Sequence, residues 1–502
     1  MLLINELKLK LNDNEDKLKE LIEKKLKAKI NSFEIKKKSL DARKTPQYVY
    51  SVIVDIDNED KYLSKDIHKY VKENLKAEYI DRNKTCIVVG YGPSGIFSAY
   101  RLIEAGYKVI VFDIGKRIKD RETDVEKFFN EGILDENSNV QFGEGGAGTF
   151  SDAKLTTRIK NKYIDYILDI LVRHGAKKEI KYVNHAHIGT DKIRKVIENI
   201  TDYLIEKGCI FHFSEKVNDI VLDENRKVKA VVTDKDTYPC DYLLLGIGHS
   251  AHDTFRMLHE KEVYIEKKDI ALGFRVEHPQ SFIDERQTNN LLNEASEYFL
   301  SHKDEKGVYS FCMCPGGIVI PAMSQKNTIV TNGMSYEKRD SGIANSAILI
   351  QIRANEFDDG FTYLNNIEKQ AYLYSNSYKA LSQNIRDFMN NEVNELIFES
   401  TYPLNTVLYD FNNLFNENDA MILKRAFMDF DKKIPGFIDK GIMVGPETRS
   451  SCPVRIKRND NGESVNTSGL YPMGEGAGYG GGIMSCALDG IRIANCIILT
   501  YE

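Results

Sequence analysis

Six residues near position 90 have the composition and spacing of a backbone site for a dinucleotide pyrophosphate. The segment Gly-Tyr-Gly-Pro-Ser-Gly at 90–95 directly follows an apolar run over 85–89, and a helical pattern continues over 96–105. This succession predicts a buried strand, a glycine turn and a helix. The start of such a helix presents free N–H groups and the positive end of the helix dipole to an anion.

Each residue of this segment has a predicted role. Gly90 makes the tight turn, Gly92 leaves room for the backbone to approach phosphate oxygens, and Gly95 lets the helix pack close to the strand. Pro93 and Ser94 lie at the expected start of the helix, so we assign them to the same site.

A second apolar run over 109–112 ends at Asp113, which lies 21 residues after Gly92. A carboxylate at this distance is expected to bind a ribose hydroxyl. Because strand, turn, helix and acid occur in the right order, the pattern favours a nucleotide site over a glycine turn without a ligand.

Three further glycine-containing segments are candidates for the same site. A loop over 141–155 is rich in glycine and ends in hydroxyl side chains, and an apolar run from 242 ends in Gly-Ile-Gly at 246–248. Near the end of the chain, a strand pattern at 470–474 leads into more glycines and a helical pattern over 483–498. Such segments let backbone donors approach a ligand. The residues assigned from them are Gly145, Gly146, Thr149, Ser151, Gly248, Gly474, Glu475, Gly480, Gly481, Gly482 and Ile483.

Composition limits the class of protein. A chain of 502 residues predicts two or three domains, and a net charge of −6 argues against a general polyanion binder. Eight cysteines are scattered without the paired spacing of zinc ligands, so we expect a reducing cytoplasm and no metal site. We also expect neither a signal peptide nor a membrane-spanning segment.

The first 80 residues have a different charge balance, because the first fifty hold 13 Lys and Arg against 8 Asp and Glu. Periodicity predicts a β-α-β-β-α module with strands at 2–9, 33–37 and 49–56 and helices at 15–29 and 64–75. Lys36, Lys37, Lys38 and the segment Asp41-Ala42-Arg43-Lys44 lie around its loop. They form either a solvated rim, which we favour, or a docking surface for an anionic partner such as RNA.

The region 271–440 has the pattern of an inserted substrate domain. Its predicted elements are strands at 270–277, 308–311, 318–321 and 328–331 and helices at 344–353 and 367–389. Its candidates for chemistry are Arg275, Glu277, His278, Cys312, Cys314, Ser335 and Arg339, of which Arg275, His278 and Cys312 are the catalytic candidates.

Each catalytic candidate also has a structural alternative. Arg275, like Arg449, either holds an anionic substrate or pairs with nearby carboxylates. His278 precedes a proline and is therefore extended; it is a structural histidine at a strand end or a proton donor. Cys312 and Cys314 would share one strand face, and we favour two buried apolar thiols over a redox pair.

The whole set of motifs resembles the FAD-dependent dehydrogenase (NAD(P)/FAD-dependent oxidoreductase) family of bacteria over nearly the full chain. The segments that carry the resemblance are 90–95, 141–155, 187–191, 273–280, 311–317, 332–335, 445–449 and 474–478. One position departs from the family pattern, since Ala153 stands where glycine is expected. The resemblance implies FAD binding and an oxidoreductase fold, and it names no substrate.

The fold implied is α/β, a Rossmann-like FAD-binding domain that is split in sequence by one inserted domain and preceded by a small module. We expect the FAD-binding domain over 81–270 and 441–502, an inserted α+β substrate domain over 271–440, and a small N-terminal α/β module over 1–80. In such a flavoprotein Glu475 would bind a ribityl hydroxyl. The helix beginning at Ile483 would direct N–H groups at the flavin N1/O2 edge, which becomes negative on reduction.

The predicted function is an FAD-dependent oxidoreductase that transfers hydride between flavin N5 and a small-molecule substrate. The other Gly-x-Gly-x-x-Gly spacings, at 143–148 and 476–481, lie in segments already assigned to the FAD site, so we expect no dedicated NAD(P)H-binding domain. The electron donor is therefore a transiently docked NAD(P)H, the substrate itself or another redox protein. Two alternatives stay open: a flavoenzyme that modifies or reduces a structured RNA through residues 1–80, and a flavin-binding protein with a regulatory role.

Overall fold

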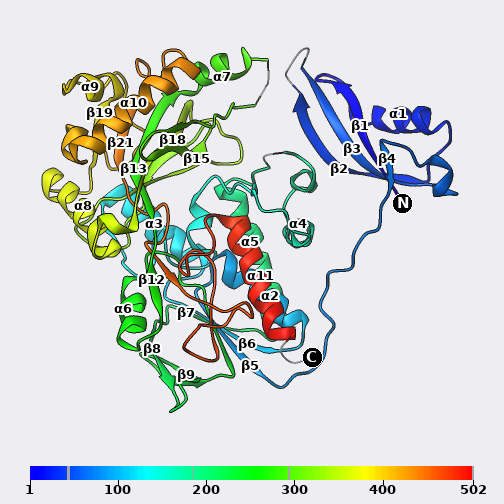
Figure 1. Ribbon diagram of the computed structural model, residues 1–502, viewed down its shortest axis with the longest axis horizontal. Helices are drawn as coiled ribbons and strands as arrows, with labels where there is room; N and C mark the ends of the chain where they lie inside the picture. The colour runs from blue at the N-terminus through cyan, green and yellow to red at the C-terminus, as the bar shows by residue number, and fades with distance from the viewer. Residues whose placement is uncertain (42–45, 185, 292–293, 500–502) are drawn as a thin grey trace. The chain divides into compact units, whose positions relative to one another are not determined.

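The computed structural model describes residues 1–41, 46–184, 186–291 and 294–499, and the chain divides into two compact units (Figure 1). Unit 1 consists of Met1–Lys76 and Lys154–Ile188, and unit 2 of Ala77–Ala153 and Gly189–Glu502. The stretch 154–188, which we grouped with the FAD-binding residues, thus packs with the first 76 residues. The domain boundaries drawn from the sequence stay a prediction, and Ala42, Arg43 and Lys44 lie outside the described residues.

Unit 1 is built on an antiparallel sheet of order β2-β3-β1-β4. One helix packs its buried face, with Leu18, Ile22 and Leu26, into the core of this sheet. The predicted first helix and first three strands are therefore confirmed. The elements are β1 (Leu2–Lys10), α1 (Lys17–Leu26), β2 (Ser32–Asp41), β3 (Gln47–Asp55) and β4 (Ile67–Lys69).

The helix predicted at 64–75 is wrong. The short strand β4 pairs with β1 there, and residues 70–84 have neither helix nor strand. The apolar residues Ile67, Val71 and Leu75 have helical spacing, but only Ile67 is buried, and Val71 is 77% exposed. A helix with no surface to cover gains little from its apolar face.

The second segment of unit 1 contains α4 (Tyr163–Arg173) and a 3-10 turn at Lys178–Lys181. It leaves and returns through a paired neck, in which Lys154 forms an antiparallel bridge with His187 and Leu155 N donates to Ala186 O at 2.9 Å. Further along, Lys38 N donates to Tyr182 O at 2.6 Å. This segment therefore forms hydrogen bonds with the outer edge of strand β2.

Two lysines of the predicted rim, Lys36 and Lys38, are engaged within unit 1. Lys36 forms an ion pair with Asp165 on α4, and Lys38 lies 2.7 Å from Glu15 and over the ring of Tyr48. Unit 1 as a whole holds 26 Lys and Arg against 17 Asp and Glu, although the full chain is acidic.

Unit 2 contains a parallel five-stranded sheet of order β23-β11-β5-β6-β7. Strands from both ends of the chain meet in it, which confirms the α/β fold class with a Rossmann-like sheet split in sequence. The strands are β5 (Thr85–Val89), β6 (Lys108–Asp113), β7 (Ile210–Phe213), β11 (Tyr242–Leu245) and β23 (Leu470–Pro472).

Helices α2 (Pro93–Glu104) and α11 (Ile483–Leu499) run side by side (Figure 1), and a Cβ at Gly490 would lie 2.2 Å from Ser94 O. This close packing brings the two glycine-rich ends of the chain together. The other elements around the sheet are α3 (Ile118–Glu131), α5 (Thr190–Glu206), α6 (His252–Glu260), and the small sheet of β8 (Val217–Leu222), β9 (Val228–Thr233) and β10 (Thr237–Pro239).

The inserted region forms a larger, mostly antiparallel sheet of order β14-β15-β18-β13-β21-β19-β20, with the main apolar core between it and its helices. The strands are β13 (Ile270–Pro279), β14 (Ser301–Lys303), β15 (Gly307–Cys314), β18 (Ile343–Ile352), β19 (Ala380–Asn384), β20 (Thr406–Leu408) and β21 (Ile442–Glu447). The helices are α7 (Gln280–Thr288), α8 (Gly360–Ser375), α9 (Ile385–Asn390) and α10 (Glu417–Lys433). Short pairs are formed by β12 (Ile265–Lys267) with β22 (Val454–Ile456), and β16 (Ile318–Pro321) with β17 (Thr331–Met334).

Three predictions in this region are wrong. The expected helix at 344–353 is the interior strand β18, in which nearly every residue is buried. The expected helix at 367–389 is the end of α8, then β19, then α9, and the strand expected at 328–331 begins only at Thr331. A strand buried on both faces has a continuous apolar run that periodicity does not distinguish from a buried helix.

None of the helices within the described residues has the combination of length and apolar character that crossing a membrane requires.

Candidate functional site

The carboxyl ends of four neighbouring parallel strands meet at one edge of the five-stranded sheet. Gly90 follows β5, Asp113 ends β6, Gly248 follows β11 and Gly474 follows β23. In open parallel sheets ligands bind in the crevice outside these ends. The sheet topology therefore gathers residues that are nearly four hundred positions apart in the sequence.

One group of glycines at this edge is packed against protein backbone or side chain. A Cβ at Gly90 would lie 2.3 Å from Gly246 O, and a Cβ at Gly95 would lie 2.0 Å from Gly90 O. A Cβ at Gly474 would lie 2.5 Å from Ser94 Oγ. These contacts leave no room for a side chain, so these glycines let the turn, the helix and the strands pack together.

A second group of glycines borders open space. For Gly248, Gly481 and Gly482, an added Cβ would meet no heavy atom within 4 Å among the described parts of the chain, apart from its own neighbours. For Gly92 the nearest atom would be Gly146 Cα at 3.8 Å. Backbone groups of three different loops are thus accessible at the same edge of the sheet. A ligand with several phosphate and ring atoms requires such a surface.

Asp113 holds the glycine turn in place. Its carboxylate accepts hydrogen bonds from Tyr91 N and Gly115 N, both at 2.8 Å, and only 7% of the residue is exposed. Burial raises the pKa of this carboxyl above its ordinary value, although the two backbone donors act in the opposite direction. Each carboxylate oxygen keeps a second lone pair. The predicted contact with a ribose hydroxyl is therefore compatible with these bonds and stays a prediction.

The glycine loop at 143–148 is organised by Arg121 of α3, which the sequence analysis missed. Arg121 is fully buried, and burial lowers its pKa to about 9. Its guanidinium donates to Asn139 O, Val140 O, Glu144 O, Gly146 O and Thr149 Oγ1. Nothing in the surrounding sequence Lys-Asp-Arg-Glu-Thr-Asp marks this arginine, because an exposed helix has the same composition.

Both predicted hydroxyl ligands of this loop already have partners. Thr149 Oγ1 donates to Gly146 O at 2.8 Å, and Ser151 Oγ donates to Gly148 O at 2.8 Å. The loop also packs on the other segments, since a Cβ at Gly146 would lie 2.9 Å from Gly92 Cα. The loop therefore faces the glycine turn at 90–95 with its backbone groups, and not with these hydroxyl groups.

Ala153 follows this loop with φ 51°, in the left-handed region that favours glycine. The residue is fully buried. The backbone here therefore has the conformation for which the family resemblance leads us to expect glycine.

The start of α11 is the third part of the site. A Cβ at Gly148 would lie 3.0 Å from the side chain of Ile483, so the loop and this helix start adjoin. Gly481 and Gly482 are exposed, while Gly480 packs on Cys486, where an added Cβ would lie 2.6 Å from Sγ. Glu475 is partly exposed, with His249 Nδ1 at 3.6 Å from its Oε1.

Arg275 and His278 lie inside the seven-stranded sheet. Arg275 is 0% exposed and bonds to Asn345 Oδ1, Cys312 O and Glu447 Oε2, the last at 3.3 Å. His278 is also fully buried, with Nε2 at 2.8 Å from Phe437 O, and burial lowers its pKa to about 4. This geometry favours the structural alternative for both residues.

Cys312 and Cys314 do not share a strand face. A β-bulge separates Phe311 from Cys314, and Cys312 has φ 42°. Cys312 is exposed and Cys314 is buried, with its Sγ at 3.3 Å from Cys312 O. The alternation that would place both thiols on one face is therefore interrupted at this point.

The remaining candidates of the inserted region are also engaged in internal contacts. Thr401 N donates to Glu277 Oε1 at 3.1 Å, and burial raises the pKa of this carboxyl. Ser335 Oγ donates to Pro315 O at 3.0 Å, and Arg339 pairs with Asp152 and Glu297. The polar groups of these side chains are thus occupied by hydrogen bonds and ion pairs inside the protein.

Comparison with known proteins gives two matches to family descriptions. Residues 269–450 match "FAD-dependent protein, C-terminal domain-like", and residues 1–57 match a domain of unknown function (DUF8436). An uncharacterized protein of Clostridium beijerinckii is 40% identical over 528 aligned positions, which cover 99% of each chain. The chain belongs to this family of FAD-dependent proteins. The family resemblance inferred from the motifs is thereby confirmed.

The solved structures that the comparison matches include two dehydrogenases, both of low sequence identity and low TM-score. The glycerol-3-phosphate dehydrogenase of Bacillus halodurans, complexed with FAD, is 11% identical, with a TM-score of 0.39 over 84% of this chain and 65% of that one. The L-proline dehydrogenase of P. horikoshii is 12% identical, with a TM-score of 0.36 over 83% of this chain and 94% of that one. None of these comparisons supports the RNA-binding alternative.

Proposed function

We propose that this chain is an FAD-dependent oxidoreductase that transfers hydride between the flavin and a small-molecule substrate. The observation that carries the proposal is the set of glycines that border open space at the carboxyl edge of the parallel sheet, Gly92, Gly248, Gly481 and Gly482. The family match to FAD-dependent proteins supports the choice of FAD among dinucleotides.

The residues present fit the parts of FAD in turn. The N–H groups at the start of α2, at Ser94 and Gly95, have no side-chain cap, so they are available to the pyrophosphate. Asp113 serves the adenosine ribose, and Glu475 serves the ribityl chain. The backbone at Gly482 and Ile483 serves the flavin edge, whereas Gly481 N donates to Ser485 Oγ at 3.0 Å.

When bound, FAD supplies hydride transfer at flavin N5. The chain contributes the position of the cofactor and the polarity around it. The α11 N-terminus stabilises negative charge at the flavin edge, because its unpaired N–H groups and helix dipole point outward from the helix start. A transiently docked NAD(P)H as electron donor and the cytoplasm as location stay predictions.

Release of the cofactor from purified protein tests the proposal. Boiling the protein and separating the supernatant by chromatography should yield FAD. FMN, or no flavin after reconstitution with FAD, would contradict the assignment, since FMN lacks the ribose that Asp113 is proposed to bind. Anaerobic mixing with NADH and with NADPH should bleach the flavin absorbance with one of them if a nicotinamide is the donor.

A further inference from the structure

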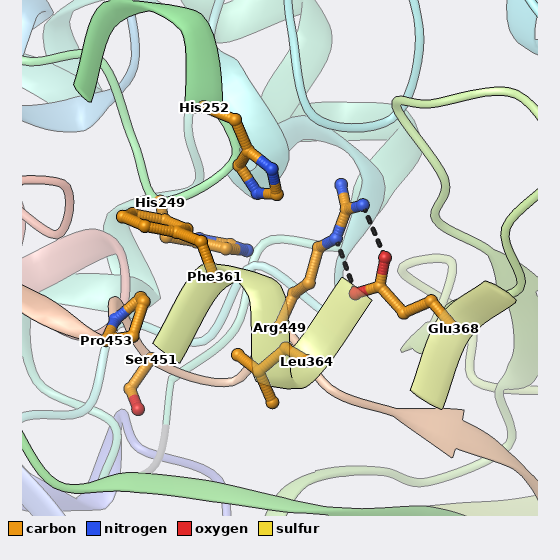
Figure 2. A pocket seen from close by; sticks show the side chains of 8 residues that line it. All are labelled: His249, His252, Phe361, Leu364, Glu368, Arg449, Ser451 and Pro453. Carbon is orange, nitrogen blue, oxygen red and sulfur yellow. Dashed lines mark hydrogen bonds and ion pairs between the residues drawn. The ribbon is translucent and has the colours of Figure 1, made fainter. Parts of the chain in front are cut away.

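A small cavity is lined by eight residues, among them His249, which directly follows Gly248 in the chain (Figure 2). His249 from the connection after β11 and His252, the first residue of α6, line it, together with one face of α8 and the chain that follows β21. The walls contributed by Phe361, Leu364 and Pro453 are apolar. Its free space is that of about one water molecule.

The two charged residues that line this cavity form an ion pair with each other. Arg449 binds Glu368 through two bonds, Nε to Oε1 at 3.0 Å and Nη2 to Oε2 at 2.8 Å, and both side chains are almost fully buried (Figure 2). Arg449 Nη1 also donates to Ser324 Oγ at 2.5 Å. Arg449 is therefore held by Glu368 and by Ser324. This arrangement favours the alternative in which Arg449 pairs with a nearby carboxylate over the one in which it holds an anionic substrate.

The two histidines differ in their surroundings. Gln325 Nε2 lies 3.1 Å from His252 Nδ1, and burial, followed by the charge of Arg449, lowers the pKa of His252 to about 4. His252 is therefore neutral near pH 7. His249 is 91% buried, and its Nε2 has no hydrogen-bond partner among the residues that the structure describes. Its Nδ1 faces Glu475 Oε1 at 3.6 Å.

A buried imidazole nitrogen without a partner is costly unless a water completes its hydrogen bond. The cavity offers room for that water beside polar neighbours. On the other side, the same ring faces Glu475, the residue assigned to the flavin ribityl chain. His249 thus connects the flavin site with the cavity.

We propose that His249 and Glu475 form a proton relay, in which His249 Nε2 exchanges a proton with water held in the cavity. The inference rests on the proposed oxidoreductase function. Two-electron oxidation of a carbon that bears O–H or N–H releases one hydride, which the flavin accepts, and one proton, which requires a base. In the relay Glu475 takes the substrate proton and passes it to His249 Nδ1, and Nε2 releases a proton to the water in the cavity; substrate reduction runs the same steps in reverse.

The charged and titratable groups near His249 are Glu475, His252 and the ion pair of Arg449 with Glu368. His252 is held neutral, and Arg449 and Glu368 offset each other as a buried ion pair. Histidine is the side chain whose ordinary pKa lies nearest to neutral pH.

The first test measures the pKa of His249 by NMR in the purified protein labelled at histidine ring carbons. His249→Gln assigns the resonance, and Glu475→Gln should lower the measured titration midpoint of that resonance, because it removes the facing negative charge. His259, exposed on α6, provides the internal reference, and its titration should not move. An unchanged pKa of His249 in Glu475→Gln would overturn the pair.

The second test follows the midpoint potential of the bound flavin against pH. A relay coupled to the flavin should produce a change of slope at the pKa of His249, and this change should vanish in His249→Gln while persisting in the matched control His259→Gln. A change of slope that persists in His249→Gln would exclude the relay. Absence of FAD would contradict the proposed function instead, and the NMR titration, which requires no flavin, still decides whether the pair exists.

Discussion

The two large sheets of unit 2 place their chemically distinctive residues in opposite ways. The parallel sheet presents backbone from Gly92, Gly248 and Gly481 to open space at its carboxyl edge. The seven-stranded sheet encloses Arg275, Glu277 and His278, each 0% exposed. Residues without side chains thus form the accessible site, and those with the most reactive side chains are sealed inside.

The difference shows which property locates a site in this fold. Charged and titratable side chains serve equally well to fix a buried strand and to act on a ligand, so their type alone does not distinguish the two uses. A glycine with space beside it has no packing reason to be glycine. Accessibility at a convergence of strand ends is therefore the more informative signal here.

Removal of the buried cation should have the largest effect. Arg275→Met would leave Glu447 buried without its partner, and we expect the free energy of unfolding to fall by about 3–5 kcal/mol. Denaturant unfolding measures the change. Arg386→Met, which breaks the exposed ion pair with Asp439, is the control and should cost less than about 1 kcal/mol. If Arg275→Met folds as stably as the unmodified protein but loses turnover, Arg275 belongs to the active site and the comparison fails.

Two alanine substitutions in one turn should separate the packed glycines from the open ones. Gly95→Ala places Cβ 2.0 Å from Gly90 O, so we expect a loss of about 1–3 kcal/mol in stability together with loss of FAD. Gly92→Ala meets only an ordinary contact, so the apoprotein should stay within about 1 kcal/mol of the unmodified one. Its FAD affinity should nevertheless fall at least about tenfold, which corresponds to about 1.4 kcal/mol.

Thermal unfolding of apoprotein and fluorescence titration with FAD measure the two effects. Equal losses of stability in both variants would show that Gly92 is also a packing glycine, and the open edge would then have to be redefined.

The sealed histidine should make stability depend on pH in a defined window. The folded-state pKa of His278 is about 4, below the unfolded value of 6.5. Between these values the unfolded chain binds more protons, so stability falls as pH decreases from 6.5 towards 4, by up to about 1.4 kcal/mol per unit. Urea unfolding at several pH values should show a shallower decline for His278→Gln. Parallel slopes would indicate that His278 is accessible and protonated in the fold.

The smallest effect is expected at the exposed thiol of the bulge. Cys312→Ser should change the free energy of unfolding by less than about 0.5 kcal/mol. In the folded protein a thiol reagent should modify Cys312 before buried Cys314, and peptide mass spectrometry identifies the site. Faster labelling of Cys314 would mean that the sheet around Arg275 opens readily and is not sealed.

The sequence predicted the parallel sheet well because strand, glycine turn and helix are local patterns. The apolar run before Gly90 and the acid at Asp113 fixed the strand ends that build the site. The sequence did not predict strand β18, because Ile343–Ile352 is buried on both faces and its apolar residues show no periodicity. It also predicted a helix around Val71, which has helical spacing but no apolar surface to pack against.

Long-range contacts also limit how much of the site could be predicted from the sequence. Arg121 holds the loop at 143–148 from a helix whose sequence resembles a solvent-exposed one. The bulge at Cys312 depends on the partner strand β18 and on Arg275, which binds Cys312 O at 2.8 Å. Neither feature has a local signature, because each is decided by a residue more than twenty positions away.

The paired neck at Lys154 and His187 has a consequence for genetic manipulation of the chain. Because this segment begins and ends at one place, deletion of residues 155–186 leaves two chain ends close enough to be joined, although it takes α4 away from the sheet of unit 1. Truncation before residue 77 is the less suitable cut, since it would delete the sheet and retain α4, half of a folding unit encoded in two separate pieces. Any gene rearrangement that transfers unit 1 to another scaffold must therefore carry both pieces together.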